Sequence, residues 1–253
     1  MDRITSRKNP IIQQLRAFGR ERAARASAGR FVGDGEKLLR EAIESGARLD
    51  TVLWAEQPSM PVPDGVRQYT APAELVDYVS ALSHSPGPVF SLAMEPLPLP
   101  ERLNRVVVLE SVQDPGNVGT VLRTANALGM DAVLLTGACA DLYSVKTVRA
   151  TMGAIFRLPV RALSLEEMAD LLKAHNLPLY GAALRDTAAD LRDRDLTRAA
   201  VAVGSEGQGL SEALLSRCDG EIIIPMRPGA ESLNAAVAAA VLMWEMARGE
   251  RRK

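Results

Sequence analysis

Three stretches of the chain combine glycine or proline with side chains that can position a small molecule or move a proton. They are residues 110–119 (ESVQDPGNVG), 204–210 (GSEGQGL) and 224–234 (IPMRPGAESLN). Each stretch follows a short run of apolar residues, which is typical of a buried β-strand. In open α/β sheets, ligands bind in the loops at the carboxyl ends of the strands, so these stretches are the first candidates for a functional site.

The first stretch leads into a segment with helical periodicity. Residues 114–117 (DPGN) have the composition of a turn, and Asn117 is expected to cap the helix that follows. Gly119, Arg123 and Asn126 are expected to share a face of this helix that is distinct from its apolar stripe. A ligand could approach the helix at the glycine and meet Arg123, although a solvated arginine explains this segment alone equally well.

The second and third stretches are ambiguous when each is considered alone. The glycines of 204–210 permit close approach to the backbone, but their G-x-x-G-x-G spacing follows a late strand and is not a dinucleotide fingerprint. No Lys-Ser or Lys-Thr step follows them, so the loop is not a Walker A loop either. In the third stretch Pro225 and Pro228 interrupt regular structure, and Ser232 or Asn234 can cap the next helix.

Strands and helices alternate through the carboxyl-terminal part of the chain, where they must position these three stretches. Because the strands are short and apolar throughout, we expect an α/β fold with a parallel sheet that is covered on both faces. The expected strands are 105–109, 132–135, 179–183, 200–203 and 221–224, and the expected helices are 118–128, 144–151, 165–175, 211–217 and 234–247.

Three prolines within residues 95–100 (EPLPLP) predict a linker between two parts of the chain. The part before the linker is expected to form a small α/β domain behind a basic helical arm. Its expected elements are helices at 11–26, 36–45 and 72–83 and a strand at 51–54. The predicted organisation is therefore a basic arm at 1–28, a small α/β domain at 29–95 and a larger domain at 96–253.

The chain as a whole is nearly neutral, with a net charge of −1 over 253 residues. Residues 1–30 nevertheless hold eight basic side chains against two acidic ones. Such a run is consistent with a solvated helical face or with a surface that contacts nucleic-acid phosphates. The candidate contacts for the second interpretation are Arg3, Arg7, Lys8 and Arg16.

Composition excludes several other classes. The two cysteines and two histidines have no metal-ligand spacing, which argues against a disulfide framework or a structural zinc site. The polar first ten residues do not resemble a signal peptide, and the longest apolar run, 235–244, is far shorter than the roughly 20 residues of a membrane span. We therefore expect a soluble cytoplasmic protein.

The three stretches together resemble the SpoU family of the SPOUT superfamily, whose members are RNA 2′-O-ribose methyltransferases. The resemblance is carried by DPGNVGTVLRTANALG, VAVGSEGQGLS and IPMRPGAESLNAAVA, and it covers residues 104 to 248. The amino-terminal part is similar, in ITSRKNPIIQQLR and FVGDGEKLLREAIESG, to the RNA substrate-binding domain often attached to this family. That domain has a fold like that of certain kink-turn-binding ribosomal proteins.

The resemblance implies a parallel sheet whose carboxyl-terminal stretch forms a trefoil knot, and a homodimer that pairs through the last helix. It also implies that S-adenosyl-L-methionine, without a metal, binds in the knot against Gly204, Ile224 and Leu233. The residues on positions that the family associates with catalysis and substrate placement are Asn117, Arg123, Glu206, Ser232 and Asn234.

The chemistry of these residues leaves the proton acceptor open. Relatives are described as using the arginine that matches Arg123 as a base, but a guanidinium stays protonated at ordinary pH and is better suited to grip a phosphate. Glu206 is the alternative acceptor. We expect ribosomal RNA as the substrate, because a separate domain suits recognition of a folded loop. The alternatives are transfer RNA as the substrate and a non-catalytic RNA-binding protein on the same fold.

Overall fold

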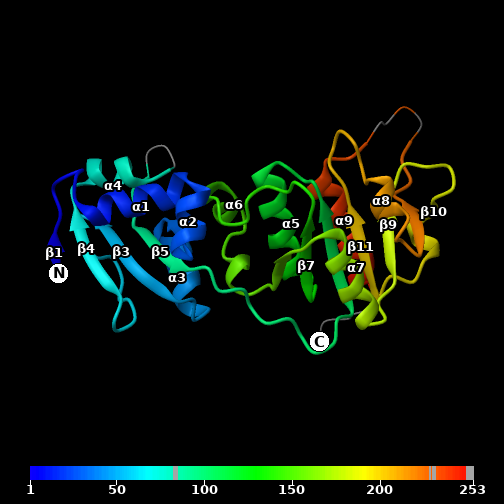
Figure 1. The fold of residues 1–253 in the computed structure, drawn as a ribbon, viewed down its shortest axis with the longest axis horizontal. Coiled ribbons are helices and arrows are strands. Elements are labelled where there is room, and N and C mark those ends of the chain that lie inside the picture. The colour runs from blue at the N-terminus through cyan, green and yellow to red at the C-terminus, as the bar shows by residue number, and fades with distance from the viewer. Residues whose placement is uncertain (82–84, 228, 230–231, 249–253) are drawn as a thin grey trace. The chain divides into compact units, whose positions relative to one another are not determined.

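The computed structural model describes residues 1–81, 85–227, 229 and 232–248 (Figure 1). Of the residues discussed above, Pro228 and the end of the expected helix 72–83 lie outside this part. The chain forms two compact units. The first unit consists of Met1–Glu95 and Asp141–Phe156, and the second unit consists of Pro96–Ala140 and the chain from Arg157 onward.

The first unit is a five-stranded mixed sheet in the order β1-β4-β3-β5-β2, in which β5 runs antiparallel to both of its neighbours. Apolar residues alternate along the strands, so that one face packs on α1 and α4 and the other on α3. The elements are β1 (Asp2–Arg3), α1 (Pro10–Arg20), α2 (Arg22–Ala28), β2 (Arg30–Asp34), α3 (Glu36–Glu44), β3 (Leu49–Ala55), β4 (Arg67–Ala71), α4 (Ala73–Val79) and β5 (Val89–Ala93).

The basic amino-terminal segment differs from the sequence prediction. The expected helix 11–26 is two helices, because Glu21 adopts an extended conformation with φ −115° and ψ 114°. The first of these helices buries Ile12, Leu15 and Phe18 in the core of the first unit. The segment therefore belongs to the folded unit and is not a free arm.

The second unit is a seven-stranded sheet in the order β10-β12-β9-β11-β6-β7-β8, and all of its strand pairs are parallel, as the sequence predicts. The five expected strands are present, and the short β8 and β10 are additional. The elements are β6 (Arg105–Glu110), α5 (Pro115–Ala127), β7 (Ala132–Thr136), β8 (Val160–Ala162), α7 (Leu165–Ala174), β9 (Leu179–Ala182), β10 (Ala189–Asp190), η2 (Leu191–Asp193), β11 (Ala199–Val203), α8 (Glu212–Leu215), β12 (Gly220–Ile223) and α9 (Ala235–Ala247).

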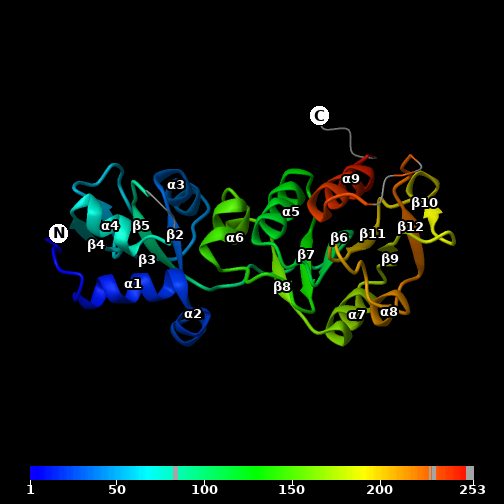
Figure 2. The ribbon, with the colours of Figure 1, turned by 90° about the horizontal axis from the view of Figure 1, so that it is seen from above.

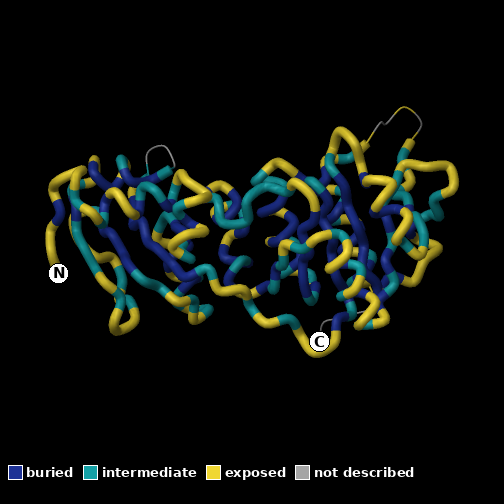
Figure 3. The backbone as a smooth tube through the Cα atoms, in the orientation of Figure 1, coloured by how far each residue is buried: buried dark blue, intermediate teal, exposed yellow. Residues whose placement is uncertain are grey.

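Helices cover both faces of this sheet. Figure 2 shows α7 and α8 on one face and α5 and α9 on the other. The central strands β6, β7 and β11 are buried along their whole length, as Figure 3 shows. Because the strands are parallel, the loops that follow β6, β11 and β12 leave the same edge of the sheet. No described helix is long and apolar enough to cross a membrane.

Residues 141–156 belong by their contacts to the first unit, although they follow the predicted domain boundary by more than 40 residues. They form α6 (Val145–Ala150) and a 3₁₀ turn, η1 (Ala154–Phe156). Val145 is buried in the core on one face of the five-stranded sheet, and Val148 and Phe156 are buried in the core on the other. The first unit is therefore assembled from two separate segments of the chain.

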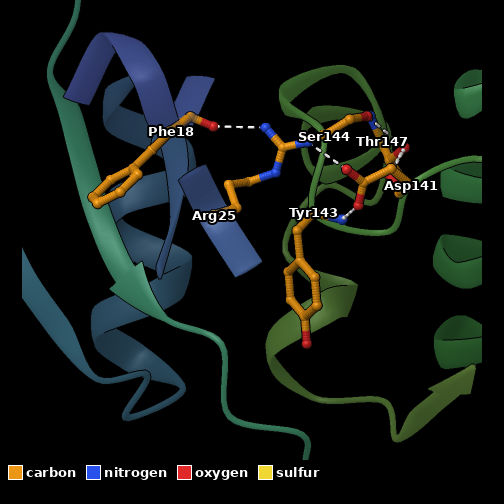
Figure 4. A network of polar contacts seen from close by, with 6 residues as sticks. All are labelled: Phe18, Arg25, Asp141, Tyr143, Ser144 and Thr147. Carbon is orange, nitrogen blue, oxygen red and sulfur yellow. Dashed lines mark hydrogen bonds and ion pairs between the residues drawn. The ribbon is translucent and has the colours of Figure 1, made fainter. Parts of the chain in front are cut away.

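An ion pair joins these two segments (Figure 4). The guanidinium of Arg25, of which only 5% of the side chain is exposed, pairs with the carboxylate of Asp141. It also donates a hydrogen bond of 2.7 Å to the carbonyl oxygen of Phe18. The other oxygen of Asp141 accepts from the Tyr143 amide at 3.0 Å, so both carboxylate oxygens have partners.

We expect Asp141→Asn to destabilise the first unit by about 3 kcal/mol, because it leaves a buried guanidinium without its counterion. Urea unfolding followed by the fluorescence of Trp54, which is buried in this unit, measures the change. The control is Glu56→Gln, which breaks the exposed Arg3–Glu56 pair and should cost less than about 1 kcal/mol. Equal effects of the two variants would contradict the assignment.

Candidate active site

Asn117, Glu206 and Asn234 meet although they come from three different loops. The Asn117 side-chain amide donates to Glu206, and the Asn234 amide donates to the Asn117 oxygen at 3.1 Å. The Asn234 amide also lies 3.5 Å from the same oxygen of Glu206. Two amides and one carboxylate thus form a compact polar cluster at the carboxyl edge of the second sheet.

Two helix starts hold this cluster. The sequence predicts Asn117 as the cap of α5, but the cap is Asp114. The Asp114 side chain accepts a hydrogen bond from the backbone amide of Asn117 at 2.8 Å. Asn117 lies inside the first turn, where its own side chain is free to reach Glu206. The prediction that Asn234 can cap the last helix is confirmed. Its side-chain oxygen accepts from the backbone amides of Ala236 and Val237 at the start of α9, at 3.0 and 3.2 Å.

Arg123 lies on α5, six residues or about 9 Å along the helix axis from Asn117. It is exposed and makes no hydrogen bond or ion pair with any residue that the structure describes. We expected Gly119, Arg123 and Asn126 to share a face outside the apolar stripe. Gly119 is instead buried with that stripe, and Asn126 is half-buried. The guanidinium is therefore available to a ligand but is not part of the polar cluster.

A cavity of about 540 Å³ opens beside the cluster and lies within the size range of small-molecule sites. Gly204, Ile224 and Leu233 all line it, and so do Glu206 and Ser232. Glu206 therefore faces both the cavity and the two asparagines. The three positions that the family resemblance associates with cofactor binding thus line one cavity.

The glycine loop forms one wall of this cavity, and its path requires glycine. A Cβ atom on Gly204 would lie 2.1 Å from the carbonyl carbon of Gly209, closer than real contacts allow. The Gly209 amide donates to the Ser205 oxygen at 2.9 Å, and Gly209 itself has φ +66°. Gly204 therefore has no room for a side chain, and Gly209 adopts a left-handed conformation that other residues rarely adopt.

Sequence reasoning missed part of the cavity lining. This part consists of residues 182–185, at the end of β9 and just after it, and of Leu215 on α8. Strand β9 lies between β11 and β12 in the sheet, so the loop that follows it reaches the same edge. The sequence carries no signal for that strand order, and residues 182–185 contain no glycine or proline that would mark them.

An apolar groove of about 460 Å³ begins on the other side of the polar cluster. Asn117 and Asn234 line one end of it, and Val237, Val241 and Trp244 of α9 line the rest. These three apolar side chains are 50%, 37% and 67% exposed. Their spacing of four and three residues gives α9 a continuous apolar face that the described chain leaves uncovered.

The predicted nucleic-acid contacts Arg3, Arg7, Lys8 and Arg16 lie in the first unit. Arg3 pairs with Glu56 at 2.9 Å. Arg16 donates to the carbonyl oxygen of Tyr78 near the end of α4 and lies 3.9 Å from the centre of its ring. Arg7 lies 4.4 Å from the same ring, and the exposed Lys8 makes no ion pair with any residue in the described ranges.

Neither cysteine of the chain provides a nucleophile near neutral pH. Burial raises the pKa of the Cys139 thiol, and burial together with nearby carboxylates raises the pKa of Cys218 to about 12. Both groups are therefore protonated thiols under ordinary conditions. Among the described residues there is also no group of three or more His, Cys, Asp or Glu side chains that could hold a metal ion.

Comparisons with known proteins identify the family. Residues 104–244 match the SpoU rRNA Methylase family. The chain is 32% identical to the Bacillus subtilis 23S rRNA (guanosine(2553)-2′-O)-methyltransferase RlmP, over 97% of this chain and 99% of that one. It is also 32% identical to the 23S rRNA (uridine(2479)-2′-O)-methyltransferase of Streptomyces viridochromogenes, over 97% of this chain and 92% of the relative.

A solved structure extends the likeness to the fold. The AdoMet-bound rRNA methyltransferase of Sinorhizobium meliloti superposes with a TM-score of 0.86 and 27% identity over 97% of both chains. The family match runs through all three loops that form the cavity and the polar cluster. The chain therefore belongs to the SpoU rRNA methylase family.

Proposed function

We propose that this protein transfers a methyl group from S-adenosyl-L-methionine to a ribose 2′-hydroxyl of ribosomal RNA. The observation that carries the proposal is that Glu206 faces both the cavity and the Asn117–Asn234 pair in a member of this family. Both curated relatives are named 2′-O-methyltransferases of 23S rRNA, one for a guanosine and one for a uridine. The reaction at the ribose is thus common to both names, whereas the base is not.

The alternatives have less support. A transfer RNA substrate has less support because the two relatives described above, each matching 97% of this chain, are named for 23S rRNA. A non-catalytic RNA-binding protein would be expected to lose Asn117, Arg123 or the glycine loop, and all of them are present. We also infer a cytoplasmic location, because both relatives are bacterial enzymes of ribosomal RNA.

The residues of the cavity fit the proposed cofactor. Ile224 and Leu233 provide apolar surface for a flat adenine ring, and the backbone of the glycine loop provides donors and acceptors for its edge. When bound, S-adenosyl-L-methionine supplies a methyl group that is activated by a sulfonium. We infer that the chain after β12 forms the trefoil knot expected of the family. Support comes from β12, which lies between β9 and β10, and from α9, which returns to pack on α5 and β11.

The polar cluster and Arg123 would act on the RNA. The amides of Asn117 and Asn234 hold Glu206 in place and can orient the ribose, with Ser232 beside them in the cavity wall. In-line transfer requires the ribose oxygen to be aligned and its proton to be removed. Glu206 is the carboxylate of the polar cluster and our candidate acceptor for that proton, and Arg123 is suited to grip the adjacent phosphate with two parallel hydrogen bonds.

We also infer a homodimer that buries the apolar groove. Exposed Val237, Val241 and Trp244 form a face typical of a helix that packs against a partner, and Ala236 and Ala240 beside them permit close approach. The groove ends at Asn117 and Asn234, so a second subunit seated there would border the active site.

Cofactor binding should depend on Gly204. We expect Gly204→Ala to weaken the binding of S-adenosylhomocysteine by at least about tenfold, because the new methyl group would collide with Gly209. Gly207→Ala is the matched control in the same loop, because a Cβ atom there meets nothing within 4 Å. Calorimetry measures both affinities. Wild-type affinity in the Gly204 variant, or none in the wild-type protein, would contradict the cofactor site.

Methyl transfer should depend on Arg123. We expect Arg123→Ala to lower kcat/KM on 23S rRNA by about 100-fold, while the affinity for S-adenosylhomocysteine stays nearly unchanged. Arg123→Lys should recover little, because an ammonium cannot make the planar two-point contact. Transfer of a labelled methyl group measures the rates, with the exposed Arg102→Ala as control. Near-normal turnover of the alanine variant would show that the guanidinium has no role.

RNA binding should depend on the basic side chains that the first unit leaves available. Replacing Arg7 and Lys8 by Gln should lower the RNA affinity and reduce the slope of log K against log salt by about 1.4–1.8. A double change of Arg48 and Arg67 to Gln removes the same charge from residues that are paired with Glu95 and Asp50. Fluorescence anisotropy at several salt concentrations compares the two variants, and equal slopes would exclude a phosphate contact.

The dimer should dissociate when its apolar face is charged. We expect sedimentation equilibrium of the wild-type protein to give twice the chain mass, and Val241→Asp to give the mass of one chain. Met152→Asp is the control, because it charges an exposed apolar residue of the first unit that lines neither the apolar groove nor the cavity. A monomeric wild-type protein at micromolar concentration would refute the dimer.

A further inference from the structure

Glu110, the last residue of β6, is a buried carboxylate whose two oxygens bind the same residue. Only 8% of Glu110 is exposed. One oxygen accepts from the Ser211 backbone amide at 2.7 Å, and the other accepts from the Ser211 hydroxyl at 2.6 Å. The two residues are 101 positions apart in the chain.

Ser211 directly follows the glycine loop and begins α8. Its hydroxyl oxygen, which donates to Glu110, accepts in turn from the Leu214 amide at 3.1 Å and so caps the helix. The residue before it, Leu210, is buried in the core of the second unit. Leu210 and Ser211 therefore hold the end of the glycine loop against the core, β6 and α8.

The start of the loop is fixed as well. Gly204 follows β11, which pairs with β6 in a register that places Val203 beside Leu109. Between these two fixed ends, the Ser205–Gly209 contact closes the loop, and Glu206 lies within it. The placement of Glu206 is thus set by the two ends of a short closed loop.

The same glutamate begins the loop that carries Asn117. Only residues 111–114 separate Glu110 from the start of α5, on which Asn117 lies. Glu110 is therefore joined covalently to the loop of Asn117 and by two hydrogen bonds to the loop of Glu206. No other contact between these two loops is as buried among the described residues.

Joining two loops through a buried carboxylate carries a desolvation cost. Removing the charge from water costs several kcal/mol, and an apolar contact of the same volume would stabilise the fold at least as well. The carboxylate instead fixes the geometry of the contact, because two hydrogen bonds to one residue set its distance and orientation. Residues 106–109 of β6 are apolar, and Glu110 is the charged residue at the end of the strand that meets the candidate active site.

We propose that Glu110 is a positioning residue for methyl transfer: through Ser211 it sets the glycine loop against β6 and so aligns Glu206 with Asn117 and the cofactor cavity. The inference rests on the proposed function. It predicts that weakening the Glu110–Ser211 contact lowers kcat while the KM for RNA, which depends on contacts elsewhere, stays unchanged.

The test compares Glu110→Gln, Ser211→Ala and the double variant in the full-length protein, on an unmodified 23S rRNA transcript at saturating S-adenosyl-L-methionine. We expect each single change to lower kcat by about tenfold, and the double variant to lose much less than the product of the two, because both weaken the same Glu110–Ser211 contact. Ser211→Thr retains the hydroxyl and should recover kcat. A multiplicative loss of about 100-fold in the double variant would overturn the proposal.

Matched controls separate positioning from stability. Ser164, like Ser211, caps a helix and bonds a glutamate, here Glu167 in an exposed capping box at the start of α7, in the same unit but outside the cavity lining. Ser164→Ala should lower the melting temperature as Ser211→Ala does, but leave kcat at the wild-type value. A kcat of Ser211→Ala within about twofold of wild type would refute the inference.

The proposed function can fail independently of this inference. If the wild-type protein neither binds S-adenosylhomocysteine nor methylates the transcript, the methyltransferase function is wrong. If the wild-type protein is active and the Glu110 and Ser211 variants are equally active, only the positioning role is wrong.

Discussion

The parallel pairing of β11 with β6 is the constraint on which the active site depends. Its register places Val203 beside Leu109, so the chain leaves both strands at the same level of the sheet. The loop after β6 carries Asn117, and the loop after β11 carries Glu206. A shift of one strand by a single residue would separate these side chains by about 3.3 Å and reverse the faces of the buried residues.

The sequence predicts the second unit well and the first unit poorly, for a physical reason. The strands of the second unit are apolar throughout and alternate with helices, which is the pattern of a parallel sheet. In the first unit β1 has two residues, and β4 (RQYTA) is mostly polar or only half-buried. Such strands are stabilised by pairing with neighbours, so their own composition carries little signal.

The candidate active site likewise contains residues that the sequence reveals and residues that it does not. Asn117, Glu206, Ser232 and Asn234 could be proposed because they lie in the three stretches that have unusual composition and that carry the resemblance to the SpoU family. Residues 182–185 and Glu110 could not, because their importance arises from strand order and from a contact across 101 positions. In the basic segment the sequence shows the charges but not how the fold uses them. Arg16 and Arg25 are used within the unit to bind carbonyl oxygens of Tyr78 and Phe18.

The discontinuity of the first unit has a consequence during synthesis. Its core is complete only when Val148 and Phe156 have left the ribosome, long after the last strand of its sheet, β5, has been made. At about 5–20 residues per second, the amino-terminal sheet must wait several seconds with part of its apolar surface unprotected. The first unit therefore completes its core only after β6 and β7 of the second unit have been synthesised.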